Sequence, residues 1–423
     1  MLKIGDQHQV NINELDYKGD GITKIANTYF YVQGVLKGEE VIVEITNLKG
    51  KYGNAKVVKI IKESNNRVNK TSLLGSLNLY HLAFSEQLNW QKRITKETLE
   101  RALQIDILVN ETVTDNREFN YRNKVVFHVL KGNVLKLGLF SNNNQSLEVV
   151  NNFILASKQV NEILTILNSA RIAIDNNVLS NIVFKNNRRG QILVTIVSNN
   201  KDFKGLKDLV NVLKAFKNVI GLTINLKKYQ EKILSNESIL VYGINLLEDN
   251  NLLINDQSFM QVNFGVMDLT YNLIKENIKG SKIIDAYSGV GSIGFSVYSN
   301  DKQITMIENN SANVSLANKI KSDNNYHNID IVLSNTEDVI KDYSADTIII
   351  DPPRKGLKES LINEIINNDI KRVIYLSCDL QTLTRDLRVF SNNYDIDKVY
   401  PIKMFPQTNA FETLVILNRK MLD

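Results

Sequence analysis

From about residue 259 to the C-terminus, short apolar runs alternate with segments of helical periodicity. The runs lie at residues 282–286, 303–307, 330–333, 347–350 and 372–376. Several are apolar throughout, which is typical of strands buried on both faces of a sheet. Such strands separated by helices predict an α/β fold with a doubly wound, Rossmann-like parallel sheet. A closing strand is expected at residues 412–417.

The first 62 residues follow another pattern, of short alternating strands separated by glycine turns. Strands are expected at residues 9–15, 21–25, 29–33, 40–48 and 54–61. Five such strands in so short a stretch predict a small β-barrel of the oligonucleotide-binding type. Lysines that can meet phosphates lie near its turns, at Lys18, Lys24, Lys37, Lys49, Lys51 and Lys56. Acidic residues nearly balance them, so solvated loop charge is the alternative interpretation.

The middle of the chain predicts a mixed α/β domain. A helix is expected at residues 85–103, and strands then alternate with helices from about residue 111 to residue 254. We therefore predict three domains, at residues 1–62, 63–255 and 256–423.

Composition excludes several classes of site. The single cysteine rules out an intramolecular disulfide and a cysteine-ligated zinc or iron–sulfur site, and the four histidines show no metal-ligand spacing. The net charge of +5 permits a nucleic-acid partner without requiring one. No stretch approaches the roughly 20 apolar residues of a membrane span, and the first residues lack the apolar core of a signal peptide. We expect a cytoplasmic protein with no membrane partner.

A glycine-rich turn, DAYSGVGSIG at residues 285–294, follows the first strand of the sheet. Gly289 and Gly291 let a ligand approach the backbone and the start of the next helix. The next strand ends in Glu308, whose carboxylate can accept hydrogen bonds from both ribose hydroxyls. The turn also contains G-x-G-x-x-G, so a dinucleotide is the alternative ligand. Asp285 and the later motifs favour S-adenosylmethionine.

The fourth strand runs into Asp351-Pro352-Pro353-Arg354. Two prolines give a stiff loop at the carboxyl edge of the sheet, where ligands bind in this architecture. Amino-methyltransferases acting on adenine or cytosine carry a similar motif followed by an aromatic ring. Arg354 replaces that ring and disfavours amino methylation. A rigid loop capped by Asp351 is the structural alternative.

The lone cysteine, Cys378, lies between the fifth strand and a segment expected to be helical. A helix N-terminus lowers a thiol pKa and favours the thiolate, so this position predicts a reactive cysteine. The alternative for a lone cysteine is a small buried hydrophobe. Glu412 stands just before the last strand. We expect the fold to bring it to the same edge, a surface charge being the alternative.

Together these motifs resemble the RNA uridine-C5 methyltransferases, the family that includes tRNA and 23S rRNA ribothymidine-forming enzymes. DYKGDGI, YVQGVLKGEEV and YGNAKV look like that family's TRAM domain, and YRNKVVFHV looks like a motif of its central domain. SFMQVN, DAYSGVGSIG, IIIDPPRKGL, YLSCDLQTLTRDL and MFPQTNAFET then follow in the family's order. The resemblance covers nearly the whole chain.

The resemblance implies a TRAM barrel and a central domain that bind RNA, and a C-terminal methyltransferase domain. It assigns S-adenosylmethionine contacts to Gln261, Tyr287, Gly289, Ser292, Glu308, Asn335 and Asp351. It makes Cys378 the nucleophile and Glu412 the base. Addition of the thiolate at C6 of uracil makes C5 nucleophilic, and a carboxylate can then remove the C5 proton. The target base must leave its stack, and Arg354 or backbone donors would stabilise the enolate oxygen.

The chain also departs from the family pattern. Many relatives hold an iron–sulfur cluster on four cysteines, but residues 75–84 and Phe153, which match those positions, contain none. We therefore expect no cluster. Gln407 and Ala410 occupy places where relatives often have histidines, which argues against a histidine role there.

The expected partner is RNA, with 23S rRNA favoured over the T-loop of tRNA because the TRAM-like domain is commoner in the rRNA branch. No obligate protein partner is inferred. An adenine amino-methyltransferase and an inactive RNA-binding protein are the competing functions. Two intact sets of residues disfavour an inactive protein: Gly289, Gly291 and Glu308, and Cys378 with Glu412.

Overall fold

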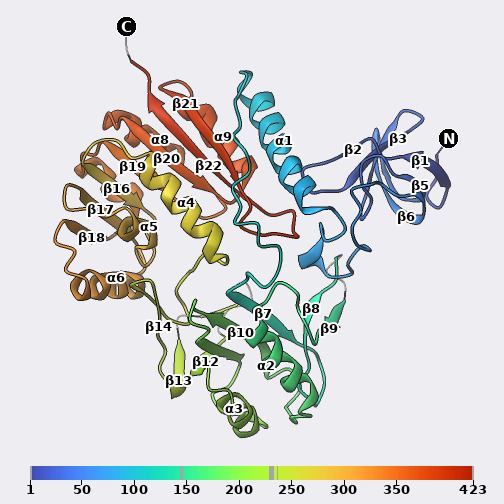
Figure 1. Cartoon of the computed structure of the whole chain (residues 1–423), viewed down its shortest axis with the longest axis horizontal. Helices are drawn as coiled ribbons and strands as arrows, with labels where there is room; N and C mark the ends of the chain where they lie inside the picture. The colour runs from blue at the N-terminus through green and yellow to red at the C-terminus, as the bar shows by residue number, and fades with distance from the viewer. Residues whose placement is uncertain (1, 143–145, 228–232, 236, 422–423) are drawn as a thin grey trace.

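The computed structural model describes residues 2–142, 146–227, 233–235 and 237–421. These residues form a barrel-like N-terminal sheet, a central sheet and a C-terminal sheet, with the two-stranded hairpin β14–β15 between the last two. In Figure 1 the barrel is blue, the central part green, and the C-terminal part yellow to red. Helix α1 (Phe84–Leu103) runs beside the C-terminal sheet, on the side toward the barrel. Among the described helices none is long and apolar enough to cross a membrane.

The N-terminal sheet has the strand order β1-β5-β6-β4-β3-β2. Its strands are β1 (Gln7–Asn11), β2 (Glu14–Leu15), β3 (Gly21–Ile25), β4 (Thr28–Val32), β5 (Glu40–Lys49) and β6 (Tyr52–Lys62). The strand predicted at residues 9–15 is in fact two strands. The chain changes partners between them, because Ile12 N donates to Glu39 O whereas Asn13 N donates to Ile22 O, both at 2.9 Å. This switch brings β1 beside β3 and curls the sheet.

The central sheet has the order β13-β12-β11-β10-β7-β8-β9. Its elements are β7 (Lys124–Val129), β8 (Leu137–Phe140), β9 (Leu147–Val149), α2 (Lys158–Ser169), β10 (Leu179–Asn186), β11 (Ile192–Ser198), α3 (Leu206–Lys214), β12 (Val219–Leu226) and β13 (Ser238–Gly243). Apolar residues of both helices pack on this sheet in one buried cluster. The hairpin of β14 (Leu247–Asp249) and β15 (Leu252–Ile254) then leads toward the C-terminal part.

The C-terminal sheet has the order β18-β17-β16-β19-β20-β22-β21. The strands of this sheet and the helices that connect them are, in chain order, α4 (Phe264–Glu276), β16 (Lys282–Ala286), α5 (Ser292–Ser296), β17 (Gln303–Glu308), α6 (Ser311–Asp323), β18 (Ile329–Leu333), α7 (Thr336–Val339), β19 (Thr347–Ile350), α8 (Glu359–Asn367), β20 (Arg372–Ser377), α9 (Leu380–Phe390), β21 (Tyr394–Ile402) and β22 (Glu412–Arg419). Strands β16 to β20 are parallel, as predicted, and β22 runs antiparallel between β20 and β21.

The apolar runs that predicted this sheet have a simple explanation. Ile348 and Ile350 of β19 belong to the buried cluster formed with α1, α8 and α9, whereas Ile349 belongs to the cluster formed with α4, α5 and α6. Successive side chains of a strand point to opposite faces. A strand covered by helices on both faces is therefore apolar at every position.

Helix α1 lies within the predicted central domain in sequence but packs on the C-terminal sheet. Leu99 joins the cluster of α8 and α9, and the segment after α1 forms parallel bridges from Val109 to Val399 and from Val113 to Ile402. The predicted boundaries at residues 62 and 255 stay predictions. Helix α1 therefore covers the same face of the C-terminal sheet as α8 and α9.

Candidate active site

The carboxyl edge of the C-terminal sheet collects most of the predicted site residues. Tyr287, Gly289 and Ser292 follow β16, Glu308 ends β17, Asn335 follows β18, Asp351 follows β19, and Cys378 follows β20. Gln261 and Glu412 reach this edge from outside the parallel strands. In a doubly wound sheet this edge is where ligands bind, since the loops there are free to vary on a fixed scaffold.

The loop after β16 is held open by its backbone and by Glu308. Glu308 Oε2 accepts from Gly289 N at 3.0 Å, and its Oε1 accepts from Asn310 N at 2.8 Å. Gly289 has a φ of +57°, and a Cβ there would meet nothing within 4 Å. Tyr287 has a φ of +61°, which is strained for a bulky residue, and its hydroxyl donates to Glu337 at 3.2 Å. The loop leaves open space beside a carboxylate.

Ser292 and Asn335 stand at the starts of α5 and α7. The buried Tyr271 lies beside Ser292; burial, followed by Asp351, raises the pKa of Tyr271 well above its usual range. Asn335 is exposed; it donates from Nδ2 to Asp338 at 2.8 Å and accepts at Oδ1 from Asn309 at 3.1 Å. Both residues therefore lie at the predicted edge with fixed orientations.

Asp285 belongs to the same edge, although it was not among the predicted contacts. Its Oδ2 accepts from Gly294 N at 2.8 Å, and burial raises its pKa to about 7. Within the described part of the chain its Oδ1 has no hydrogen-bond partner. A buried acceptor of this kind needs a donor. Its place at the end of an apolar strand was the only feature of the sequence that pointed to Asp285 as part of the site.

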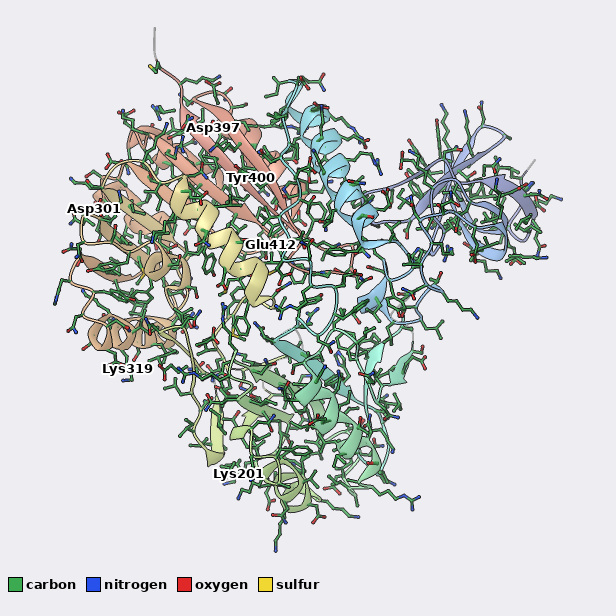
Figure 2. The ribbon with its side chains drawn as sticks, in the orientation of Figure 1. Lys201, Asp301, Lys319, Asp397, Tyr400 and Glu412 are labelled. Carbon is green, nitrogen blue, oxygen red and sulfur yellow. The ribbon has the colours of Figure 1, made fainter. Side chains whose placement is uncertain are left out.

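Cys378 and Glu412 come together through strand register. Ser377 of β20 pairs with Thr413 of antiparallel β22. Cys378 follows Ser377 directly, and Glu412 precedes Thr413 directly. The register therefore sets these two residues opposite each other, so the thiol and the carboxylate face each other across adjacent strands. Cys378 is half-buried and Glu412 is 4% exposed. Figure 2 shows Glu412 near the centre of the molecule, whereas Lys201, Asp301 and Lys319 lie toward its periphery.

Gln261, one of the predicted cofactor contacts, lies beside Glu412. Its side chain hydrogen-bonds to Glu412, which lowers the pKa of that carboxyl. Burial and then the charge of Asp351 outweigh this bond and raise the pKa of Glu412 to about 8. Burial also raises the pKa of Asp351 to about 7. Glu412 Oε2 has no hydrogen-bond partner among the described residues, so one oxygen remains available to a substrate.

The expectation that the helix end lowers the pKa of Cys378 is wrong for this arrangement. Burial raises the pKa of Cys378, and the carboxylates of Glu412 and Asp351 raise it further. Arg354 acts in the opposite direction but does not outweigh them. Two acids beside a half-buried sulfur disfavour a second negative charge. These charges therefore disfavour the thiolate in the free enzyme.

The loop before Glu412 is fixed by contacts that the sequence did not reveal. Gln407 is buried with a φ of +69° and exchanges hydrogen bonds with Gln87 of α1. Tyr121 donates from its hydroxyl to Pro406 O at 3.0 Å. Lys403 is buried, donates to Thr408 O at 3.1 Å, and has its pKa lowered to about 7 by burial. These bonds set the position from which β22 begins.

Residues matching the cluster cysteines of relatives are packed into apolar surroundings. Phe153 lies edge-on to Phe127 with ring centroids 6.4 Å apart. His81 is buried, and burial lowers its pKa to about 4. Over the described ranges, no group of three or more His, Cys, Asp or Glu side chains is placed to hold a metal ion. Side-chain packing occupies this region.

Comparison with known proteins agrees with this geometry. Residues 83–420 match the family model described as tRNA (uracil-5-)-methyltransferase, and residues 2–58 match the TRAM domain. An uncharacterized RNA methyltransferase of Caldanaerobacter subterraneus subsp. tengcongensis is 30% identical, with 99% of each chain covered. One from Staphylococcus aureus is 27% identical, with 96% of this chain and 97% of the relative covered.

A solved structure has the same overall fold. The tRNA (uracil-54, C5)-methyltransferase of Pyrococcus abyssi, in complex with S-adenosyl-L-homocysteine, has a TM-score of 0.77 and is 20% identical, with 97% of this chain and 100% of that chain covered. This chain therefore belongs to the tRNA (uracil-5-)-methyltransferase family and is an RNA (uracil-C5) methyltransferase with an N-terminal TRAM domain.

Proposed function

We propose that this enzyme forms 5-methyluridine in RNA through a covalent bond between Cys378 and C6 of the target uracil. The observation that carries the proposal is the register of β20 and β22, which sets Cys378 opposite Glu412. Asp351 and the Gly289 loop lie at the same edge. A nucleophile, a base and an open loop for the methyl donor thus converge on one place.

S-adenosyl-L-methionine is the cofactor, and it supplies an electrophilic methyl group on a positively charged sulfur. The residues present fit such a ligand. Glu308 offers its carboxylate to ribose hydroxyls beside open space at Gly289. Asp285 Oδ1 and Ser288 Oγ are buried acceptors without a partner in the described structure. We assign the cofactor contacts to Gln261, Tyr287, Gly289, Ser292, Glu308, Asn335 and Asp351. The Pyrococcus abyssi protein was solved with S-adenosyl-L-homocysteine.

The chain's own residues perform the uracil chemistry. The Cys378 thiolate forms a bond to C6, and the electron pair of the C5–C6 double bond moves to C5 and the O4 enolate. C5 then forms a bond to the methyl carbon, and the bond between that carbon and the positive sulfur would break with its electron pair going to sulfur. Glu412 removes the remaining C5 proton, the electrons of that C–H bond restore the double bond, and the C6–S bond breaks to return the thiolate. The pKa of Glu412, raised to about 8, suits a group that accepts a proton near neutral pH.

We propose 23S rRNA as the substrate, as the resemblance implies. The T-loop of tRNA is the second candidate, and one observation favours it. The Pyrococcus abyssi enzyme, which by its name acts on tRNA, shares the fold over 97% of this chain. Mapping 5-methyluridine in the rRNA and tRNA of a strain lacking the gene separates the two. Loss from rRNA alone supports the first candidate, and loss from tRNA alone supports the second.

The function itself is tested with Cys378→Ala. Because the thiol attacks the base and not the sulfonium, the variant is expected to bind S-adenosylmethionine with nearly unchanged affinity in calorimetry. It is expected to transfer no labelled methyl group to RNA. Ser391→Ala, which removes a hydroxyl just beyond the far end of α9, is the matched control and should retain activity. Substantial turnover by Cys378→Ala would contradict the covalent mechanism.

A further inference from the structure

The outer face of the N-terminal barrel carries a group of exposed tyrosines. Side chains of β4 alternate, so that Phe30 and Val32 enter the core while Tyr29 and Tyr31 point outward. Tyr29 pairs in register with Tyr52 of β6. Tyr29 is 43% exposed and Tyr52 is 55% exposed. These rings contribute little to the barrel core and are open to a ligand.

The rings form a continuous surface with cations beside it. Tyr29 and Tyr52 are stacked, with centroids 6.2 Å apart and planes inclined by 26°. Lys24, the register partner of Tyr29 on β3, places its ammonium 5.4 Å from the Tyr29 centroid. Tyr31 lies two residues after Tyr29 on the same face of β4, and it lines a cavity together with Tyr17. The tyrosine face is therefore Tyr17, Tyr29, Tyr31 and Tyr52.

A groove continues from the tyrosine face toward the active site. It is a cavity of about 510 Å³ between the barrel, α1 and α9, and Tyr17 and Tyr31 line its barrel side. Arg101 of α1 and Arg388 of α9 line the opposite sides. Across the described ion pairs, neither guanidinium meets a carboxylate. The acidic residues of the groove already have partners, since Glu14 and Glu97 pair with Arg93 and Asp16 accepts from the backbone N of Lys18 and Asp20. Arg101 and Arg388 therefore favour an anionic occupant.

The groove reaches the part of the chain that carries catalysis. Gln381 lines it and lies in the first turn of α9, which begins two residues after Cys378. Leu15 and Leu36 of the barrel part share a buried cluster with Leu380 and Phe411. Leu380 adjoins the nucleophile's turn and Phe411 precedes Glu412 directly. The barrel therefore packs against residues next to Cys378 and next to Glu412.

The barrel's attachment is also hydrogen-bonded. Trp90 of α1 donates from Nε1 to Asp16 O at 2.9 Å, and Asn409 donates from Nδ2 to Lys18 O at 2.8 Å. Asp16 and Lys18 flank Tyr17. These bonds fix the backbone on either side of Tyr17 relative to α1 and to the loop before Glu412, so the tyrosine face has a set position relative to the active site.

We propose that the tyrosine face is a stacking platform for unpaired bases of the substrate RNA, and that the groove carries the backbone of the same strand to Cys378. This inference rests on the proposed function for the identity of the strand. Aromatic rings beside lysines suit single-stranded nucleic acid, since every base has a π-face and stacking tolerates any sequence. A paired helix hides its bases and offers only phosphates. The platform therefore selects RNA that is unpaired next to the target uridine.

Direct binding tests the platform. The probe is a labelled single-stranded RNA of about 12 nucleotides, measured by anisotropy with the full chain, and its duplex with the complement serves for comparison. Tyr29→Leu with Tyr52→Leu is expected to weaken single-strand binding about tenfold or more and duplex binding far less. Tyr29→Phe with Tyr52→Phe keeps the rings and is the matched control, expected to bind like the wild type. A Leu variant that binds single strands like the wild type would overturn the proposal and leave this face to a different partner.

Salt dependence separates stacking from phosphate contacts. The Leu variant should keep the slope of log affinity against log salt, whereas Arg101→Ala should lower that slope by about one. If the Leu variant does not fold, photocrosslinking of wild-type protein to 5-iodouridine RNA replaces it. Crosslinks on the peptides carrying Tyr29 or Tyr52 support the platform, and crosslinks confined to other parts of the chain contradict it. Tyrosine-dependent binding without any 5-methyluridine product would refute the proposed function and leave the platform standing.

Discussion

Gln87 and Gln407 lie 320 positions apart in sequence and exchange two hydrogen bonds: Gln87 Nε2 donates to Gln407 Oε1, and Gln407 N donates to Gln87 Oε1, both at 3.0 Å. Gln87 Nε2 also donates to Leu82 O at 2.9 Å. A side chain of α1 thus holds the loop from which Glu412 enters the site. Residues distant in the chain are needed to complete the catalytic edge.

The variant Gln87→Ala is expected to destabilise this junction by about 1–3 kcal/mol, because it leaves buried backbone groups unpaired. Trp90, the only tryptophan, packs edge-on to Phe411 and reports the change in a urea titration followed by fluorescence. Asn89→Ala, at an exposed position of the same helix, is the matched control and should change stability little. Equal stabilities of the two variants would show that the Gln87 bonds do not hold the loop.

The buried acids predict a particular dependence of stability on pH. Burial raises the pKa of Glu412 to about 8, and those of Asp351 and Asp285 to about 7. Between the unfolded and folded pKa values the folded protein holds a proton that the unfolded chain releases. The contribution of these three acids to stability is therefore greatest below their unfolded pKa values, near pH 4, and it falls as pH rises through about 8.

The variant Glu412→Gln removes one of these titrating groups. Its free energy of unfolding should fall less between pH 4 and pH 8 than that of the wild type, by at least about 1 kcal/mol. Urea unfolding at a series of pH values provides the comparison. Parallel pH profiles for the two proteins would mean that Glu412 is not held protonated in the folded state.

The reactivity of Cys378 follows from the same charges. Because the chain has one cysteine, alkylation by iodoacetamide reports on this thiol alone. Burial, Glu412 and Asp351 raise the pKa of Cys378, so alkylation of the free enzyme should be slow at neutral pH. Glu412→Gln should speed it above about pH 8, where the wild-type carboxylate is ionised.

Ligands give an independent control for this prediction. S-adenosylmethionine carries a positive sulfur and should accelerate alkylation more than neutral S-adenosylhomocysteine does, unless it blocks access completely. A rate that is the same in wild type and in Glu412→Gln at every pH would show that the two groups do not interact.

The sequence predicted the parallel sheet closely because its strands carry apolar runs that are buried on both faces, as β19 (Thr347–Ile350) shows. It missed β21 (Tyr394–Ile402), whose exposed edge positions include Asp395 and Asp397 and hide the strand in a polar segment. Local patterns of apolar residues reveal strands that are buried. They do not reveal an edge strand such as β21, which is defined by its hydrogen bonds to the neighbouring strand β22.

The sequence predicted that Cys378 and Glu412 would meet at one edge of the sheet, and the register of β20 and β22 sets them opposite each other. Their roles, which the family resemblance implies, stay predictions. The direction of the pKa shift of Cys378 was missed, because it depends on Asp351 and Glu412 lying close in space. The bonds of Gln87 with Gln407 and the burial of Lys403 depend in the same way on tertiary packing that no local pattern encodes.

The most direct test of the covalent mechanism is Glu412→Gln incubated with S-adenosylmethionine and substrate RNA. The amide keeps the shape of the side chain and cannot accept the C5 proton, so addition and methylation proceed while elimination stalls. We predict a slow protein–RNA band on a denaturing gel, with methylated uracil attached to the peptide that carries Cys378. The wild type should give this band only with 5-fluorouridine RNA, and Cys378→Ala with Glu412→Gln should give none. Turnover of Glu412→Gln at the wild-type rate with no adduct would contradict the assignment of Glu412 as the base.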